Sequence, residues 1–173
     1  MTFCFAQQYH EIDAQVDPLS GLIEVKQLFT YTNKGSTALD TLYLYDWNHA
    51  YSDTSTPLAS KLAQEFNFKF EKSKSDEKGN TKIHEFRTTQ YNLDRHRLEK
   101  QKDIVAIHLT HPIQPQDSIL FSASYVLKLP ADDFTGYGID NINEISFRNG
   151  FLQFVNQDIE GHWNLDSNYG FND

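Results

Sequence analysis

The stretch LYLYDWNHAYSD, residues 42–53, gathers the side chains of this chain that are best suited to chemistry. On a helix, Asp46, His49 and Asp53 would share one face, where two carboxylates and an imidazole could bind a metal ion or exchange protons. On a strand that ends in a corner, the same side chains would be structural. Whether this stretch could form a metal or acid/base site therefore depends on its backbone conformation.

The hydrophobic pattern favours a corner. Residues 42–47 alternate between two faces, so we interpret them as a strand, and the next helical signal begins only at Pro57. We therefore expect the Asp and Asn side chains here to hydrogen-bond backbone groups, while Trp47 and Tyr51 wedge against the core.

No other group of residues predicts an active site. His108 and His111 lie close in sequence but lack a third ligand, which zinc requires. We expect His84 and His96 to lie on the surface, and Cys4 has no anchored histidine partner. The zinc motif H-E-x-x-H is absent from the sequence. We therefore predict no catalytic residue, no metal ligand and no cofactor in this chain.

Composition narrows the classes of partner. The 173 residues fit one domain, and the net charge of −9 argues against nucleic acid, whose phosphates attract basic proteins. A single cysteine excludes an internal disulfide. No apolar run is long enough to span a membrane.

Residues 1–7 allow two interpretations. MTFCFAQ is apolar and then abruptly polar, which is typical either of the remnant of a signal peptide or of an edge strand. The first interpretation predicts an exported protein, either periplasmic, secreted or on the cell surface.

Residues 8–173 read as a single, mainly β domain. Alternation predicts a hairpin over 9–33, a second hairpin over 103–130, and short strands near 143–147 and 151–155. One short helix is expected near 57–67, with Thr56 as its N-cap, and a solvated loop at 71–80. The fold class that follows is an antiparallel β-sandwich or a saddle-like open sheet.

The order of short motifs resembles the opening of a family of gluzincin zinc metallopeptidases, that of aminopeptidase N, in its Bacteroidetes-type branch. The motifs are YHEIDAQVDP, IEVKQLFTYTN, LDTLYLYDWNHAYSD, TPLASKLAQEF, DIVAIHLTHPIQPQDSILFSASYVLKLP, LPADDFTGYG and GHWNLDSN. The resemblance covers residues 9–173. It departs at IQPQDS, where the family has a Pro-Gly turn, and around NGFLQFVNQDIE, which has no counterpart of the family's pocket residue.

The resemblance implies a role without catalysis. In the family this region is a saddle-shaped β domain that packs against a thermolysin-like domain carrying the zinc. It would serve as scaffold and substrate-side wall, with peptide substrates reached through the parent enzyme. The structural or interface candidates that follow are Asp46, Trp47, His49, Tyr51, Phe134, Tyr137 and Trp163.

An alternative function is a freestanding extracellular module that binds glycans or proteins. Exposed rings such as Tyr137, Trp163 and Tyr169 would form its platform. A self-sufficient hydrolase has no group of residues to support it.

Overall fold

β-Strands are the main regular elements of the chain, as the alternation predicts. A computed structural model describes residues 9–89, 92–158 and 160–169. The elements along the chain are β1 (His10–Asp17), β2 (Leu22–Thr32), β3 (Leu39–Tyr45), the 3-10 helix η1 (Trp47–Tyr51), α1 (Pro57–Gln64), α2 (Lys69–Lys72), β4 (Asn80–Arg87), β5 (Asp94–Arg97), β6 (Ile104–Ile113), β7 (Ser118–Lys128), η2 (Asp132–Phe134), β8 (Gly138–Ile139), β9 (Ile145–Ser146) and β10 (Gln153–Phe154).

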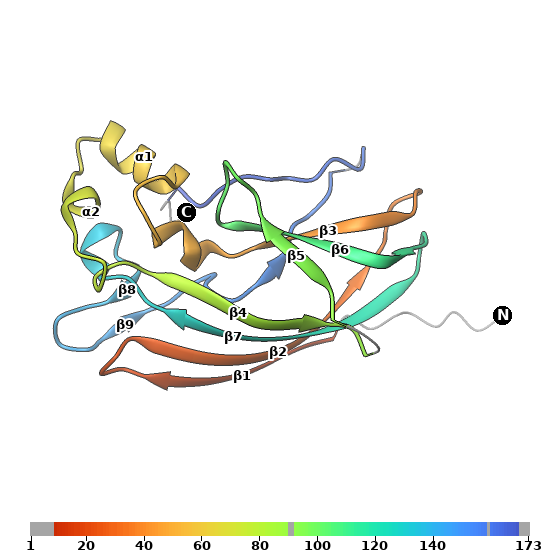
Figure 1. Cartoon of the computed structure of the whole chain (residues 1–173), viewed down its shortest axis with the longest axis horizontal. Helices are drawn as coiled ribbons and strands as arrows, with labels where there is room; N and C mark the ends of the chain where they lie inside the picture. The colour runs from red at the N-terminus through yellow and green to blue at the C-terminus, as the bar shows by residue number, and fades with distance from the viewer. Residues whose placement is uncertain (1–8, 90–91, 159, 170–173) are drawn as a thin grey trace.

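Two four-stranded antiparallel sheets pack together and confirm the mainly β fold class. Sheet A has the strand order β1-β2-β7-β4 and sheet B the order β10-β3-β6-β5. Figure 1 shows them as two layers, with α1 and α2 at the end where β4 begins. The strands β8 and β9 form a small separate hairpin.

One predicted hairpin is confirmed and the other is wrong. β1 pairs with β2 from His10–Phe29 to Asp17–Leu22, as expected. β6 does not pair with β7, because the chain crosses from sheet B to sheet A between them. Gln116 turns this crossing with a φ of 69°, and its N–H donates to the carbonyl of Asn33 at 2.8 Å. Alternation shows that both segments are strands but not that they belong to different sheets.

The core lies between the two sheets. The inner face of β2 carries the residues that period-2 spacing predicts, and buried residues of β7, β3 and β6 meet them. The buried amide of Gln27 ties the layers together, since it donates to the Leu152 carbonyl at 2.8 Å and accepts from the Tyr125 hydroxyl at 2.6 Å.

The helix α1 confirms the predicted helical segment but is shorter than 57–67. Thr56 is its N-cap, accepting from the Ala59 N–H at 3.3 Å, and Pro57 is its first residue. The helix ends because Phe66 adopts a φ of 60°, and the Asn67 N–H returns to the Leu62 carbonyl at 2.9 Å. This is a Schellman-type end with phenylalanine where glycine is usual.

The sequence did not indicate the short elements α2, β5, η2 and β8. The turn α2 carries the buried Phe70 and overlaps the first two residues of the predicted loop, and β5 forms where only surface residues were expected. No helix in the described residues is long and apolar enough to cross a membrane. The expectation for residues 1–7 lies outside the described residues.

Candidate functional site

The corner after β3 is a 3-10 turn rather than the end of a strand. β3 stops at Tyr45, and Asp46 caps η1, so that the His49 N–H donates to the Asp46 carbonyl at 2.9 Å. The prediction that 42–47 are all strand was therefore wrong by two residues. Asp46 and His49 do lie one tight turn apart, and both side chains reach Thr81 on β4.

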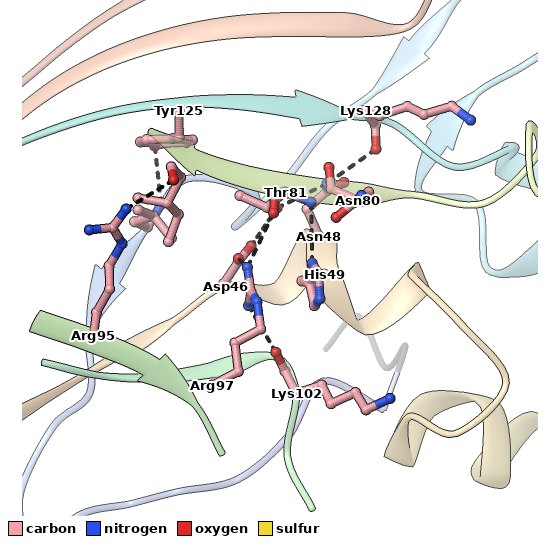
Figure 2. A network of polar contacts seen from close by, with 12 residues as sticks. Asp46, Asn48, His49, Asn80, Thr81, Arg95, Arg97, Lys102, Tyr125 and Lys128 are labelled. Atoms are coloured by element: carbon pink, nitrogen blue, oxygen red, sulfur yellow. Dashed lines mark hydrogen bonds and ion pairs between the residues drawn. The ribbon is translucent and has the colours of Figure 1, made fainter. Parts of the chain in front are cut away.

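The Asp46 carboxylate is fully buried and has two strong partners. The Thr81 hydroxyl donates to Oδ1 at 2.6 Å, and the Arg97 guanidinium donates to Oδ2 at 2.6 Å. Figure 2 shows these residues converging from η1, β4 and β5. Because Arg97 also donates to the Lys102 and Thr81 carbonyls, the ion pair joins sheet A to sheet B.

His49 is held as a neutral imidazole. Its Nδ1 accepts the Thr81 N–H at 3.3 Å. Burial, together with the nearby positive charge of Arg97, lowers the pKa of His49 to about 4, although Asp46 acts in the other direction. With Nδ1 engaged as an acceptor, the proton of the neutral ring lies on Nε2, so the ring is not poised to act as a base.

Asn48 satisfies the backbone where β4 and β7 meet the corner. Its side-chain amide donates to the Asn80 and Lys128 carbonyls at 2.8 and 3.2 Å, and its carbonyl oxygen accepts from the Tyr137 hydroxyl at 3.1 Å. Gly79 lies against this turn, where an added Cβ would stand 3.2 Å from the Asn48 carbonyl and 3.0 Å from Tyr51. The polar residues of the corner are thus used to close the fold.

Asp53 does not join Asp46 and His49. Its carboxylate accepts from the N–H and hydroxyl of Ser55 and from the Lys102 ammonium at 3.0 Å. Burial alone would raise the pKa of Asp53, but these partners outweigh it and bring the pKa to about 2. Among the described contacts, the carboxylate of Asp53 thus has partners different from those of Asp46 and His49.

A second buried carboxylate, Asp103, was missed by the sequence analysis. It accepts from the Asn168 N–H at 2.5 Å and the Ser167 hydroxyl at 2.9 Å, while its own carbonyl accepts from the Asp46 N–H at 2.7 Å. Burial raises the pKa of Asp103 against the effect of these hydrogen bonds. It fixes the C-terminal segment to the outside of the corner, and no sequence pattern links residues so far apart.

The aromatic candidates occupy three different environments. Tyr51, Phe134 and Tyr137 are buried, and the rings of Tyr51 and Tyr137 stack with centroids 5.3 Å apart. Trp163 is partly buried against Tyr43 and Tyr31, and Trp47 is partly buried beside Tyr45. Tyr169 is exposed. Tyr137 therefore offers no exposed platform, and Trp47 is less buried than its expected role as a wedge required.

An open groove of about 910 Å³ lies at the other end of β3. Its walls come from the end of β2, the loop 33–37 and residues 152–158, 160 and 161. Phe29, Tyr31 and Phe154 contribute rings, with Phe154 4.7 Å from Phe29 and 5.0 Å from Tyr31 between centroids. The sequence analysis treated these residues as strand positions only, because none carries a chemical signature.

Among the described residues, one cluster of potential metal ligands has three members. Asp158, Glu160 and His162 are all exposed, with their ligand atoms within 4.8 Å of one another. Asp158 Oδ1 already accepts the N–H groups of Glu160 and His162, so the cluster is a hydrogen-bonded loop.

No protein-family model matches this sequence, and no curated protein is significantly similar to it.

Proposed function

We propose that this chain is a non-catalytic N-terminal β domain of a zinc metallopeptidase resembling aminopeptidase N. It serves as scaffold and substrate-side wall for a thermolysin-like catalytic domain of the same polypeptide. That domain holds the zinc, and peptide substrates are reached through the parent enzyme, which is exported. The proposal rests on the ordered motifs of the sequence and on the surface described next.

The observation that carries the proposal is a set of exposed apolar side chains on three links at the helical end of the sandwich. Phe66 and Phe68 protrude from the link between α1 and α2, Leu19 from the β1–β2 turn, and Ile142 from the β8–β9 link. The side chains of Phe66 and Leu19 are 84% and 83% exposed. Figure 1 places all three links at the same end of the molecule. Large apolar side chains left exposed at one end of a domain suit a face that a partner domain covers.

The corner supports the same proposal in a second way. The side chains of Asp46, Asn48 and His49 are engaged with backbone and side-chain groups of β4, β5 and β7. A catalytic group needs an accessible nucleophile, base or acid near a place where substrate can lie. The corner instead rigidifies the helical end, which suits a surface that must hold another domain in place.

The test begins with the coding sequence beyond residue 173. We expect it to continue into a domain with H-E-x-x-H and a distant third glutamate, and a stop codon at that point would overturn the proposal. In the full-length protein, Phe66→Ser with Leu19→Ser should expose the domain junction to limited proteolysis. The control is Leu120→Ser, an exposed apolar residue on β7, which should leave the cleavage pattern unchanged.

The groove favours a second candidate, a freestanding extracellular module that binds glycans or proteins. Its aromatic side chains, Phe29, Tyr31 and Phe154, lie beside polar loop residues, a combination common in ligand sites. Tyr31→Ala should then abolish binding on an array of glycans and extended peptides, whereas Tyr169→Ala, outside the groove, should not. Retained binding in Tyr31→Ala would exclude the groove as the binding site.

A further inference from the structure

Two histidines that are distant in sequence meet on the outer face of sheet B. His96 lies on the edge strand β5 and His108 on its neighbour β6, and both are exposed. His108 Nε2 is 3.2 Å from His96 Nδ1, and the two ring planes are inclined by only 17°. The two histidines are far apart in the sequence, and no local pattern there indicates that β5 pairs with β6.

We propose that His96 and His108 form a binding site for a divalent ion of the late transition series, the class that includes Zn²⁺, Ni²⁺ and Cu²⁺. Imidazole nitrogens are preferred ligands of these ions. Two nitrogens bound to one tetrahedral zinc at about 2.0–2.1 Å lie about 3.3–3.4 Å apart. The observed separation of 3.2 Å is close to this value, so the two strands already hold the nitrogens at the spacing that a shared ion needs.

A carboxylate lies on the same face. Asp94 is the cross-strand partner of His108 and precedes His96 by two residues, so all three side chains leave the sheet on one side. Its Oδ1 accepts the Arg95 N–H at 2.9 Å, while Oδ2 is not used in that bond. The ligand atoms of Asp94, His96 and His108 do not all lie within 4.8 Å of one another, so Asp94 adds negative charge to this face while the two ring nitrogens and water bind the ion.

The cationic side chains of β5 point the other way. Arg95 donates to the carbonyl of Ile83, and Arg97 donates to Asp46, so both guanidinium groups lie on the side that faces sheet A. The alternation of β5 thus places its carboxylate and imidazole together and removes its positive charges from the ion's side of the strand.

The proton between the rings need not leave the protein when the ion binds. In the neutral pair, one nitrogen of the 3.2 Å contact donates its proton and the other accepts it. The donor ring binds the ion by taking its other tautomer, with the proton on the nitrogen that faces away. Both lone pairs then point to the ion, and the ion cross-links the edge strand β5 to β6.

The test is a titration of the purified chain with Zn²⁺, monitored by NMR through the ring ¹H–¹⁵N signals of its histidines. We expect the signals of His96 and His108 to shift together and saturate at one equivalent. His96→Gln and His108→Gln should each weaken Zn²⁺ binding by more than about tenfold. Loss of a residue that only supports a metal ligand already costs roughly tenfold or more, and loss of the ligand itself should cost more than that. Thermal melts should show a zinc-dependent rise in Tm that both variants lose, because an ion that binds only the folded state stabilises it.

Matched variants separate this site from its rivals. His84→Gln on β4, His162→Gln in the exposed loop and Cys4→Ser should each leave the affinity for Zn²⁺ unchanged. Asp94→Asn should weaken it less than His96→Gln or His108→Gln does, because Asp94 contributes negative charge rather than a ligand atom. Loss of binding in His162→Gln, full binding in His96→Gln, or no saturable binding would overturn the proposal. None of these outcomes bears on the scaffold function, which depends on the helical end.

Discussion

The two ends of the space between the sheets are lined by different kinds of residue. At the end of β3 that enters η1, a buried carboxylate, an amide and a neutral imidazole close the gap with hydrogen bonds. At the other end of β3, aromatic rings and loop backbone line a groove that stays open. The polar and ionisable side chains of the corner are therefore engaged in holding the fold. The groove is lined instead by residues whose types did not indicate a site in the sequence.

Asp46→Ala should destabilise the closed end more than any other single substitution proposed for it. The change leaves Arg97 and Thr81 without their buried acceptor. Removing one member of a buried ion pair costs about 3–5 kcal/mol, and we expect about 3 kcal/mol because Arg97 is partly exposed. Urea denaturation measures the loss as a fall in the free energy of unfolding.

The matched control is Asp53→Ala, which removes the carboxylate paired with Lys102 at the surface. An exposed pair contributes about 0–1 kcal/mol, so the control, which also loses its hydrogen bonds from Ser55, should still cost clearly less than Asp46→Ala. Equal losses for Asp46→Ala and Asp53→Ala would show that the closed end does not depend on its buried charge.

Acid should weaken the closed end through His49. Its pKa of about 4 in the folded chain lies below the ordinary value of 6.5, so the unfolded chain binds the proton more readily. The contribution is complete above about pH 6.5 and is lost as the pH falls towards 4. Between pH 8 and pH 5 the loss amounts to about 2 kcal/mol. His49→Gln should flatten this part of the pH–stability curve relative to the unsubstituted chain. An identical curve for the variant would place the titrating group elsewhere.

A substitution in the groove should change the free energy of unfolding least. Tyr31→Phe removes one hydroxyl from the groove but keeps the ring against Phe154 and Trp163. We expect the free energy of unfolding to change by no more than about 0.5 kcal/mol, as for most surface substitutions. A loss above about 1 kcal/mol would mean that the groove, like the corner, is held by its polar groups.

The strands and the helix start were predictable because their signals are local. Alternation identified the two long strands β2 and β7, and Thr56 with Pro57 marked the start of α1. The contacts between elements were not predictable in this way. Nothing near Asp46 in the sequence indicates Arg97, and nothing near His96 indicates His108, since each pair is formed by strand partners chosen across the whole chain.

The strand order also determines when sheet A can form during synthesis of the chain. Leu28 in β2 pairs with Ser122 in β7, so the centre of sheet A joins an early segment to a late one. Until β7 has left the ribosome, one edge of β2 remains without its final neighbour. Long-range pairing of this kind slows folding and leaves strand edges open to other chains. Sheet A therefore stays incomplete, with one edge of β2 open to other chains, until residues 118–128 have been translated.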